Sequence, residues 1–185
     1  MRKVTAHLFS SVDGVVESPN LWQFDAFDDE LGQMMMSALP RQDTVVLGRR
    51  TYEEWAGYWP TAGVDEGFGE FINPVTKHVA STTLTEPLDW GNSHLIEGDL
   101  VEFVRGLKES DGGEIAVNGS ISVVRQLLFG GVLDALTLTV HPVVAGAGKH
   151  LFEPGDDTTR LELVEGSTTS KGNAVLTYAL RPTDT

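Results

Sequence analysis

The sequence contains no cysteine. A chain without thiols forms no disulfide framework, no thiolate zinc site, no iron–sulfur cluster and no cysteine nucleophile. Basic residues are scarce as well, because 13 lysines and arginines stand against 27 aspartates and glutamates and leave a formal net charge of −14. A surface this acidic repels nucleic-acid phosphates and anionic lipids. We therefore expect neither a nucleic acid nor a membrane as a partner.

Long hydrophobic runs are also missing. No uncharged apolar segment reaches the roughly 18–20 residues that a membrane-spanning helix needs. Polar residues interrupt the short apolar part of the N-terminal stretch MRKVTAHLFSSVDG, so we expect no secretory signal there and a cytoplasmic location. With 185 residues, of which 41% are hydrophobic, the chain is long enough to bury a sizeable core. We expect one domain over residues 1–185.

Strand-like and helix-like patterns alternate along the chain, which is typical of an α/β fold. The patterns predict strands over 4–9, 44–47, 77–81, 94–96, 114–117, 133–140, 160–164 and 174–180. They predict helices over 31–38, 51–58, 100–107 and 121–129. The last two strands follow one another without a helix between them, so we expect them to be antiparallel. The prediction is a twisted, mainly parallel sheet with helices and an antiparallel C-terminal edge.

Two segments place glycine between the end of a strand and the start of a helix. They are Leu47-Gly48-Arg49-Arg50-Thr51 and Val117-Asn118-Gly119-Ser120. Backbone N–H groups and the helix dipole can hold a phosphate at such a turn, and glycine lets the ligand approach the backbone. Two such turns could grip a dinucleotide pyrophosphate. The alternative is that both are ordinary helix starts, with Ser120 as an N-cap and the arginines on the surface.

Other catalytic signatures are absent. The glycine pairs at 67–69 and 146–148 lack the third glycine of G-x-G-x-x-G, and the segment ending in Gly148-Lys149 lacks the first glycine of a P-loop. The five histidines show no spacing suited to a metal, and we find no pattern of a serine hydrolase. A nucleotide hydrolase, which would need a metal cluster, is therefore our third choice.

Acidic and aromatic residues are concentrated early in the chain. The acids Asp25, Asp28, Asp29 and Glu30 are most often a solvated helix start, although one of them could face a cleft and handle protons. The aromatic residues between Trp22 and Trp59 are mostly expected in the core. Loop residues Trp22 and Phe24, beside Asp13, could instead form a pocket for a flat ring.

Three stretches resemble a known family. VVLGRRTYEEW at 45–55 resembles the Gly-Arg-x-Thr-aromatic-Glu motif of dihydrofolate reductases, and SSVDGVVE at 10–17 resembles the first-strand turn of their riboflavin-biosynthesis relatives. The more specific match is IAVNGSISVVRQLLFGGVLDALTLTVHPVVAGAGKHLF at 115–152, which is similar to the C-terminal reductase domain of bacterial riboflavin-biosynthesis deaminase-reductases. The likeness runs in order through nearly the whole chain. The chain departs from these enzymes in two respects: it has no counterpart of their zinc deaminase half, and Val15 stands where the riboflavin-pathway enzymes carry a basic residue after Asp-Gly. The second departure argues against their ribityl-phosphate substrate.

The resemblance implies a dihydrofolate-reductase-like three-layer fold, NADPH as cofactor, hydride transfer to a small substrate, and a homodimer. Its motifs place the cofactor on Gly48, Arg49, Arg50, Thr51, Ser81, Thr82, Gly119, Ser120 and Ile121. Our candidates for substrate binding are Trp22, Phe24 and Tyr52. Asp13 is the first candidate for substrate orientation or proton relay, and Glu30 is the second.

We therefore expect an NADPH-dependent reductase that acts on a pteridine-, pyrimidine- or flavin-like ring. The cofactor supplies the hydride in such an enzyme, so the protein mainly positions the two reactants and relays one proton. The alternative is a non-catalytic ligand-binding protein that keeps the fold and the nucleotide cleft.

Overall fold

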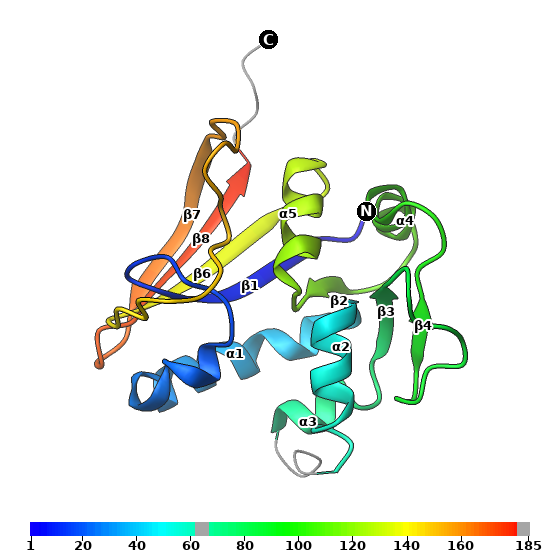
Figure 1. The fold of residues 1–185 in the computed structure, drawn as a ribbon, viewed down its shortest axis with the longest axis horizontal. Helices are drawn as coiled ribbons and strands as arrows, with labels where there is room; N and C mark the ends of the chain where they lie inside the picture. Colours follow the sequence, from blue (N-terminus) through cyan, green and yellow to red (C-terminus); the bar gives the residue numbers. More distant parts are fainter. Residues whose placement is uncertain (62–66, 181–185) are drawn as a thin grey trace.

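A computed structural model describes residues 1–61 and 67–180 of the chain, and the fold is drawn in Figure 1. Its eight strands form one sheet in the order β4-β3-β2-β5-β1-β6-β8-β7. The strands are Val4–Ser11 (β1), Gln42–Gly48 (β2), Thr76–Ala80 (β3), Ser93–Leu95 (β4), Glu114–Val117 (β5), Ala135–His141 (β6), Leu161–Thr168 (β7) and Ala174–Leu180 (β8). All pairs from β4 to β6 are parallel, whereas β8 pairs antiparallel with both β6 and β7.

Five α-helices connect or follow these strands in the described residues. They are Asp29–Ala38 (α1), Arg49–Ala56 (α2), Gly67–Ile72 (α3), Leu100–Glu109 (α4) and Ile121–Phe129 (α5). Three short 3₁₀ turns lie around α1, at Pro19–Leu21, Phe24–Ala26 and Leu39–Arg41. None of the helices in these residues is both long and apolar enough to cross a membrane.

The sheet separates two hydrophobic clusters, because successive side chains of a strand point to opposite faces. On one face, Val46 packs with the apolar sides of α4 and α5, including Val104 and Leu127. On the other face, Val45 and Leu47 pack with residues of α2 and α3. Figure 1 shows α4 and α5 on one side of the sheet and α1, α2 and α3 on the other. The result is the three-layer arrangement predicted from the sequence.

Most of the predicted elements are confirmed, with small shifts at their ends. The helix predicted over 51–58 begins at Arg49 and ends at Ala56, because the turn at Gly48 passes directly into the helix. The strand predicted over 160–164 continues to Thr168, because its backbone pairs with β8 along its whole length. Helix α3 was not predicted, since its six residues GFGEFI carry two glycines and too few turns for a periodic pattern.

Candidate functional site

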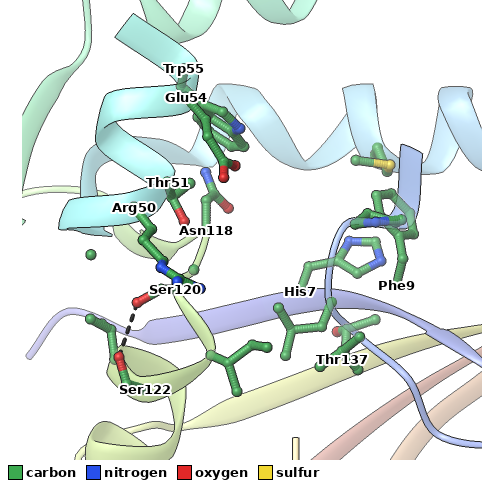
Figure 2. A pocket seen from close by; sticks show the side chains of 18 of the residues that line it. His7, Phe9, Arg50, Thr51, Glu54, Trp55, Asn118, Ser120, Ser122 and Thr137 are labelled. Atoms are coloured by element: carbon green, nitrogen blue, oxygen red, sulfur yellow. Dashed lines mark hydrogen bonds between the residues drawn. The ribbon is translucent and has the colours of Figure 1, made fainter. Parts of the chain in front are cut away.

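A groove of about 2250 Å³ opens beside the sheet, and Figure 2 shows it from close by. Its wall includes the turns that follow β2 and β5, side chains of α1 and α2, and the nearer faces of β1, β6 and β8. Typical small-molecule pockets have volumes of about 300–1000 Å³. This groove therefore has room for two ligands side by side or for one extended ligand.

The two glycine turns predicted to bind phosphate meet at one end of this groove. Strands β2 and β5 are neighbours, and the backbone N–H of Gly48 donates to the carbonyl oxygen of Gly119 at 2.9 Å. A Cβ atom on Gly48 would lie 2.9 Å from the backbone nitrogen of Ser120. Gly119 has a φ of +101°, and a Cβ atom there would lie 2.9 Å from the hydroxyl of Thr51. Both positions therefore require glycine.

The helices that start at these turns have no side-chain N-caps. Gly48 precedes α2 and Ser120 precedes α5, and neither residue caps its helix with a side-chain hydrogen bond. The Ser120 hydroxyl lies 3.1 Å from that of Ser122 instead. By contrast, Asp28 caps α1 and Asp99 caps α4. The first-turn N–H groups of α2 and α5 thus lack such a partner, which leaves two positive helix ends at the groove for an anion.

All nine residues predicted to contact a cofactor line the groove: Gly48, Arg49, Arg50, Thr51, Ser81, Thr82, Gly119, Ser120 and Ile121. Figure 2 shows Arg50, Thr51 and Ser120 close together at one end. The two arginines are exposed and form weak pairs, with Arg49 2.9 Å from Glu53 and Arg50 3.6 Å from Glu17. Exposed pairs of this kind contribute about 0–1 kcal/mol, so a bound anion can replace them at little cost.

The other end of the groove is formed by the sheet, where His7 on β1 and Thr137 on β6 line the wall (Figure 2). The Nε2 atom of His7 lies 2.7 Å from the hydroxyl of Thr139, and the hydroxyls of Thr137 and Thr177 lie 2.9 Å apart. Burial, followed by the nearby His141, lowers the pKa of His7 to about 4. This floor is therefore polar but uncharged at neutral pH.

Helices α1 and α2 form the walls above this floor. Leu31, Met34 and Met35 line the groove from α1, and Glu54 and Trp55 line it from α2. Methionine and tryptophan present polarizable, flat or adaptable surfaces that suit a planar ring. The arrangement can hold such a ring beside a nucleotide that lies on the glycine turns.

Asp13 lies outside the groove lining and connects two loops. Its carboxylate accepts from the hydroxyl of Ser11 at 2.6 Å and from the backbone N–H groups of Ala145 and Gly146 at 2.9 and 2.8 Å. The Ser11 hydrogen bond, followed by the two backbone bonds, lowers the pKa of Asp13 to about 2. The structure therefore gives this carboxylate three partners in the turn after β1 and the loop after β6.

The acidic start of α1 is built into a buried polar network. Asp28 accepts from the backbone N–H of Leu31 at 2.8 Å, from the hydroxyl of Thr169 at 2.5 Å and from Asn173 at 3.0 Å. The Thr169 bond is the largest cause that lowers the pKa of Asp28. Asn173 also contacts Nδ1 of His141, at 2.6 Å. The network ties α1 to the β7–β8 turn.

The remaining predicted residues also lie outside the groove lining. Glu30 is exposed and accepts from the backbone N–H of Ser170 at 3.2 Å. Trp22 is buried and donates its indole N–H to the carbonyl of Glu17 at 2.9 Å, whereas the side chain of Phe24 is 74% exposed. The hydroxyl of Tyr52 accepts from the backbone N–H of Trp90 in the core. The structure does not bring these side chains together with the glycine turns.

Several groove residues were not predicted, and one group of them had a usable signal. Ile96, Gly98 and Asp99 follow β4 and line the groove. A strand was predicted there, and ligands of parallel sheets bind at the carboxyl ends of strands. His7, Thr137 and Thr177 carry no such signal, because only the pairing of β1, β6 and β8 brings them together. In residues 1–61 and 67–180 there is no cluster of three potential metal ligands.

Comparison with known proteins gives a consistent result along the whole chain. The family model of the RibD C-terminal domain matches residues 2–175. The uncharacterized protein YyaP of Bacillus subtilis is 28% identical over 182 residues, which cover 96% of this chain and 94% of that protein.

Two solved structures share the fold. The riboflavin biosynthesis reductase Rib7 of Saccharomyces cerevisiae superposes with a TM-score of 0.65 at 16% identity, covering 97% of this chain and 90% of that one. A dihydrofolate reductase from Enterococcus faecalis, complexed with NADP(H), superposes with a TM-score of 0.60 at 18% identity, covering 97% and 96%. The dihydrofolate-reductase-like fold expected from the sequence is confirmed.

Proposed function

Because the chain belongs to the RibD C-terminal domain family, we propose that it is an NADPH-dependent reductase that transfers a hydride to a small heterocyclic substrate. The substrate class is a pteridine-, pyrimidine- or flavin-like ring. The family and the shared fold of reductases support a reductase, and the groove supports the choice of cofactor and ligand size.

One observation carries the proposal: two uncapped helix starts meet at a pair of obligatory glycines inside the groove. Gly48 and Gly119 are hydrogen-bonded to each other, so the N-termini of α2 and α5 converge on one place. A pyrophosphate spreads its charge over two phosphates and suits two such helix ends. In a chain of net charge −14, these turns also carry the Arg49–Arg50 pair, which supplies local positive charge.

The residues of the groove fit a nicotinamide dinucleotide. Bound NADPH supplies the hydride, and the protein has to hold the ring that accepts it and keep water away. Arg49, Arg50 and Thr51 bind the phosphates from α2 in this proposal, and Ser120 and Ile121 do so from α5. The uncharged floor around His7 and Thr137 then holds the acceptor. Asp13 orients the site by joining the loops after β1 and β6.

The direct test is a melting curve with and without NADPH. A ligand that binds only the folded state stabilises it by about 2.7 kcal/mol at a concentration of 100 times its Kd. We expect the melting temperature to rise, and we expect absorbance at 340 nm to fall when a suitable ring compound is added. No melting shift at millimolar NADPH would contradict the cofactor assignment.

A non-catalytic ligand-binding protein is the competing function. It shares the NADPH melting shift but shows no oxidation at 340 nm with dihydrofolate, pteridines, flavins or pyrimidine intermediates. Turnover with any one of these compounds favours the enzyme.

We also propose a homodimer. The apolar stretch 121–144 gives this proposal little support, because most of its large side chains, such as Val124 and Leu127, pack in the core, and only Phe129 and Val144 among them are exposed. Better support comes from the edge strand β7, where Leu163 and Val164 are 54% and 63% exposed. An exposed edge strand with apolar side chains is a natural place for a second copy to pair. Light scattering should report about twice 20.1 kDa, and a mass of one chain across micromolar concentrations would remove the dimer.

A further inference from the structure

A second cavity, of about 280 Å³, lies where the C-terminal end of α5 meets the loop that leads into β7. Its volume is close to the lower end of the range for small-molecule pockets. The residues that line it are Leu128, Phe129, Phe152, Glu153, Asp156, Asp157, Thr159 and Leu161. Of these, Phe129 and Glu153 also line the groove, whereas the other six do not. The cavity therefore adjoins the groove but has walls of its own.

Two phenylalanine rings contribute to these walls. The ring centroids of Phe129 and Phe152 are 6.5 Å apart, and the ring planes meet at 72°. Both residues remain exposed, at 43% and 40%. The guanidinium carbon of Arg125 lies 5.4 Å from the centroid of Phe129, which is within the distance at which a ring face attracts a cation. The ring of Phe152 has no such cation among the described residues, so it is available to one from solution.

Three carboxylates line the same cavity, and the protein neutralises one of them. Asp156 accepts from two nitrogens of Arg125, at 2.7 and 2.6 Å, and these bonds are the largest cause that lowers the pKa of Asp156 to about 2. Glu153 is exposed and lies 3.8 Å from Arg125. The exposed side chain of Asp157 has no ion-pair or hydrogen-bond partner within residues 1–61 and 67–180. An excess of negative charge therefore remains at Glu153 and Asp157.

The lining decides which kind of ligand fits the cavity. It includes no lysine or arginine, so an anion such as a phosphate would meet carboxylates without a compensating cation. A primary ammonium ion is compact and strongly hydrated, and it would stay in water beside the carboxylates. An ammonium ion that carries alkyl groups can instead place them on the rings and on Leu128 and Leu161, while its charge remains near the carboxylates.

We propose that this cavity binds a small organic cation whose nitrogen carries alkyl groups, of the trimethylammonium type. The alkyl groups contact Phe129 and Phe152, and the positive charge faces Glu153 and Asp157. Attraction between a cation and the faces of aromatic rings is the general chemistry by which proteins recognise quaternary ammonium ions. The proposed site lies outside the cofactor turns and goes beyond the reductase function, so it can be tested without NADPH.

The test is an NMR titration of the isotope-labelled full chain with three probes at equal ionic strength. Choline carries a trimethylammonium group. Its neutral control is 3,3-dimethyl-1-butanol, in which a carbon atom replaces the nitrogen, and its second control is ethanolamine, which has a primary ammonium group. We expect choline to shift amide signals near 128–129 and 152–161 until saturation. We expect it to bind at least about tenfold more tightly than either control.

Two variants each remove one part of the site. Phe152→Leu replaces a ring with an alkyl side chain, and Asp157→Asn removes a charge while keeping the shape. Their matched controls are Phe24→Leu and Asp111→Asn, which change an exposed ring and an exposed carboxylate outside both the cavity and the groove. We expect each cavity variant to weaken choline binding about threefold or more, and each control to leave it unchanged.

Three results would overturn the proposal. Equal binding of choline and its neutral control would show that the charge is not recognised. Shifts that do not saturate, or that spread over the acidic surface, would show an adventitious cation only. An unchanged choline affinity in Phe152→Leu or in Asp157→Asn would place the cation elsewhere. Both side chains are exposed, so we expect both variants to fold, and the amide signals distant from the cavity check this.

Discussion

The two ends of the groove are made of different parts of the protein. The glycine-turn end uses backbone N–H groups of α2 and α5, which are adjacent in space because β2 and β5 are neighbours. The sheet end uses side chains of β1, β6, β8 and α1, such as His7 and Thr137. Backbone groups recognise a feature common to all nucleotides, namely phosphate, whereas side chains can be changed one at a time. In the function we propose, the turn end therefore binds the cofactor and the sheet end binds the substrate.

The largest effect is expected from closing the space between the two turns. Replacing Gly48 with valine puts a Cβ atom 2.9 Å from the backbone nitrogen of Ser120, so one turn has to move away from the other. We expect NADPH affinity to fall more than about a hundredfold, which corresponds to more than about 2.7 kcal/mol. Fluorescence titration with NADPH measures it.

The control for this variant is Gly106→Ala. Gly106 lies in α4, and a Cβ atom there meets no atom within 4 Å. We expect unchanged NADPH affinity and a gain of up to about 1 kcal/mol in the free energy of unfolding. If Gly48→Val and Gly106→Ala bind NADPH equally well, the turns are not the cofactor end.

Lowering the pH should reduce the stability of the protein through His7 at the sheet end of the groove. The pKa of His7 is about 4 in the folded chain, against 6.5 as the ordinary value, so the unfolded state takes up the proton first as the pH falls. The stability contributed by neutral His7 is complete above pH 6.5, falls between pH 6.5 and 4, and then levels off at a loss of about 3 kcal/mol. Urea unfolding at a series of pH values across this range measures the change in the free energy of unfolding.

His7→Gln keeps a side chain that can bond to Thr139 but does not titrate. We expect the fall between pH 6.5 and 4 to become shallower in this variant, with part of the remainder due to His78 and His141, whose pKa values burial also lowers. An unchanged slope would show that His7 is not held neutral by the sheet.

A smaller effect is expected at the arginines of the turn end. NADPH carries a 2′-phosphate that NADH lacks, and a charge-assisted hydrogen bond to it contributes about 1.5–3 kcal/mol. Arg49→Ala or Arg50→Ala should weaken NADPH about ten- to a hundredfold and NADH much less. Affinities for both cofactors at low and high salt measure the ratio. If neither substitution alters it, the pair belongs to the solvated surface.

The contrast between the turn end and the sheet end also explains how much of the fold and of the candidate site the sequence alone could predict. The glycine turns are local, so Gly48 and Gly119 could be read as phosphate turns from the residues around them. Periodic apolar positions likewise predicted α1 and α4. Helix α3 could not be predicted, because six residues give no repeat.

Residues at the sheet end depend on pairing between distant strands. Thr137 faces Thr177 only because β6 and β8 pair in one register. The residues next to Thr137 and Thr177 in the sequence contain no pattern that predicts this contact. Trp22 and Phe24 looked like substrate contacts because they are aromatic residues in a loop. In the structure, the Trp22 ring packs on His141 and Phe24 points to solvent. Residue type in a loop does not determine whether a side chain reaches the groove.

The most direct test of the central claim, that the glycine-turn end binds the cofactor, is a crystal structure of the protein with NADPH. We predict pyrophosphate oxygens within hydrogen-bonding distance of the first-turn backbone N–H groups of α2 and α5, between Gly48 and Gly119, with the nicotinamide directed toward His7 and Thr137. Density for NADPH elsewhere on the protein, or no density at saturating NADPH, would contradict the account.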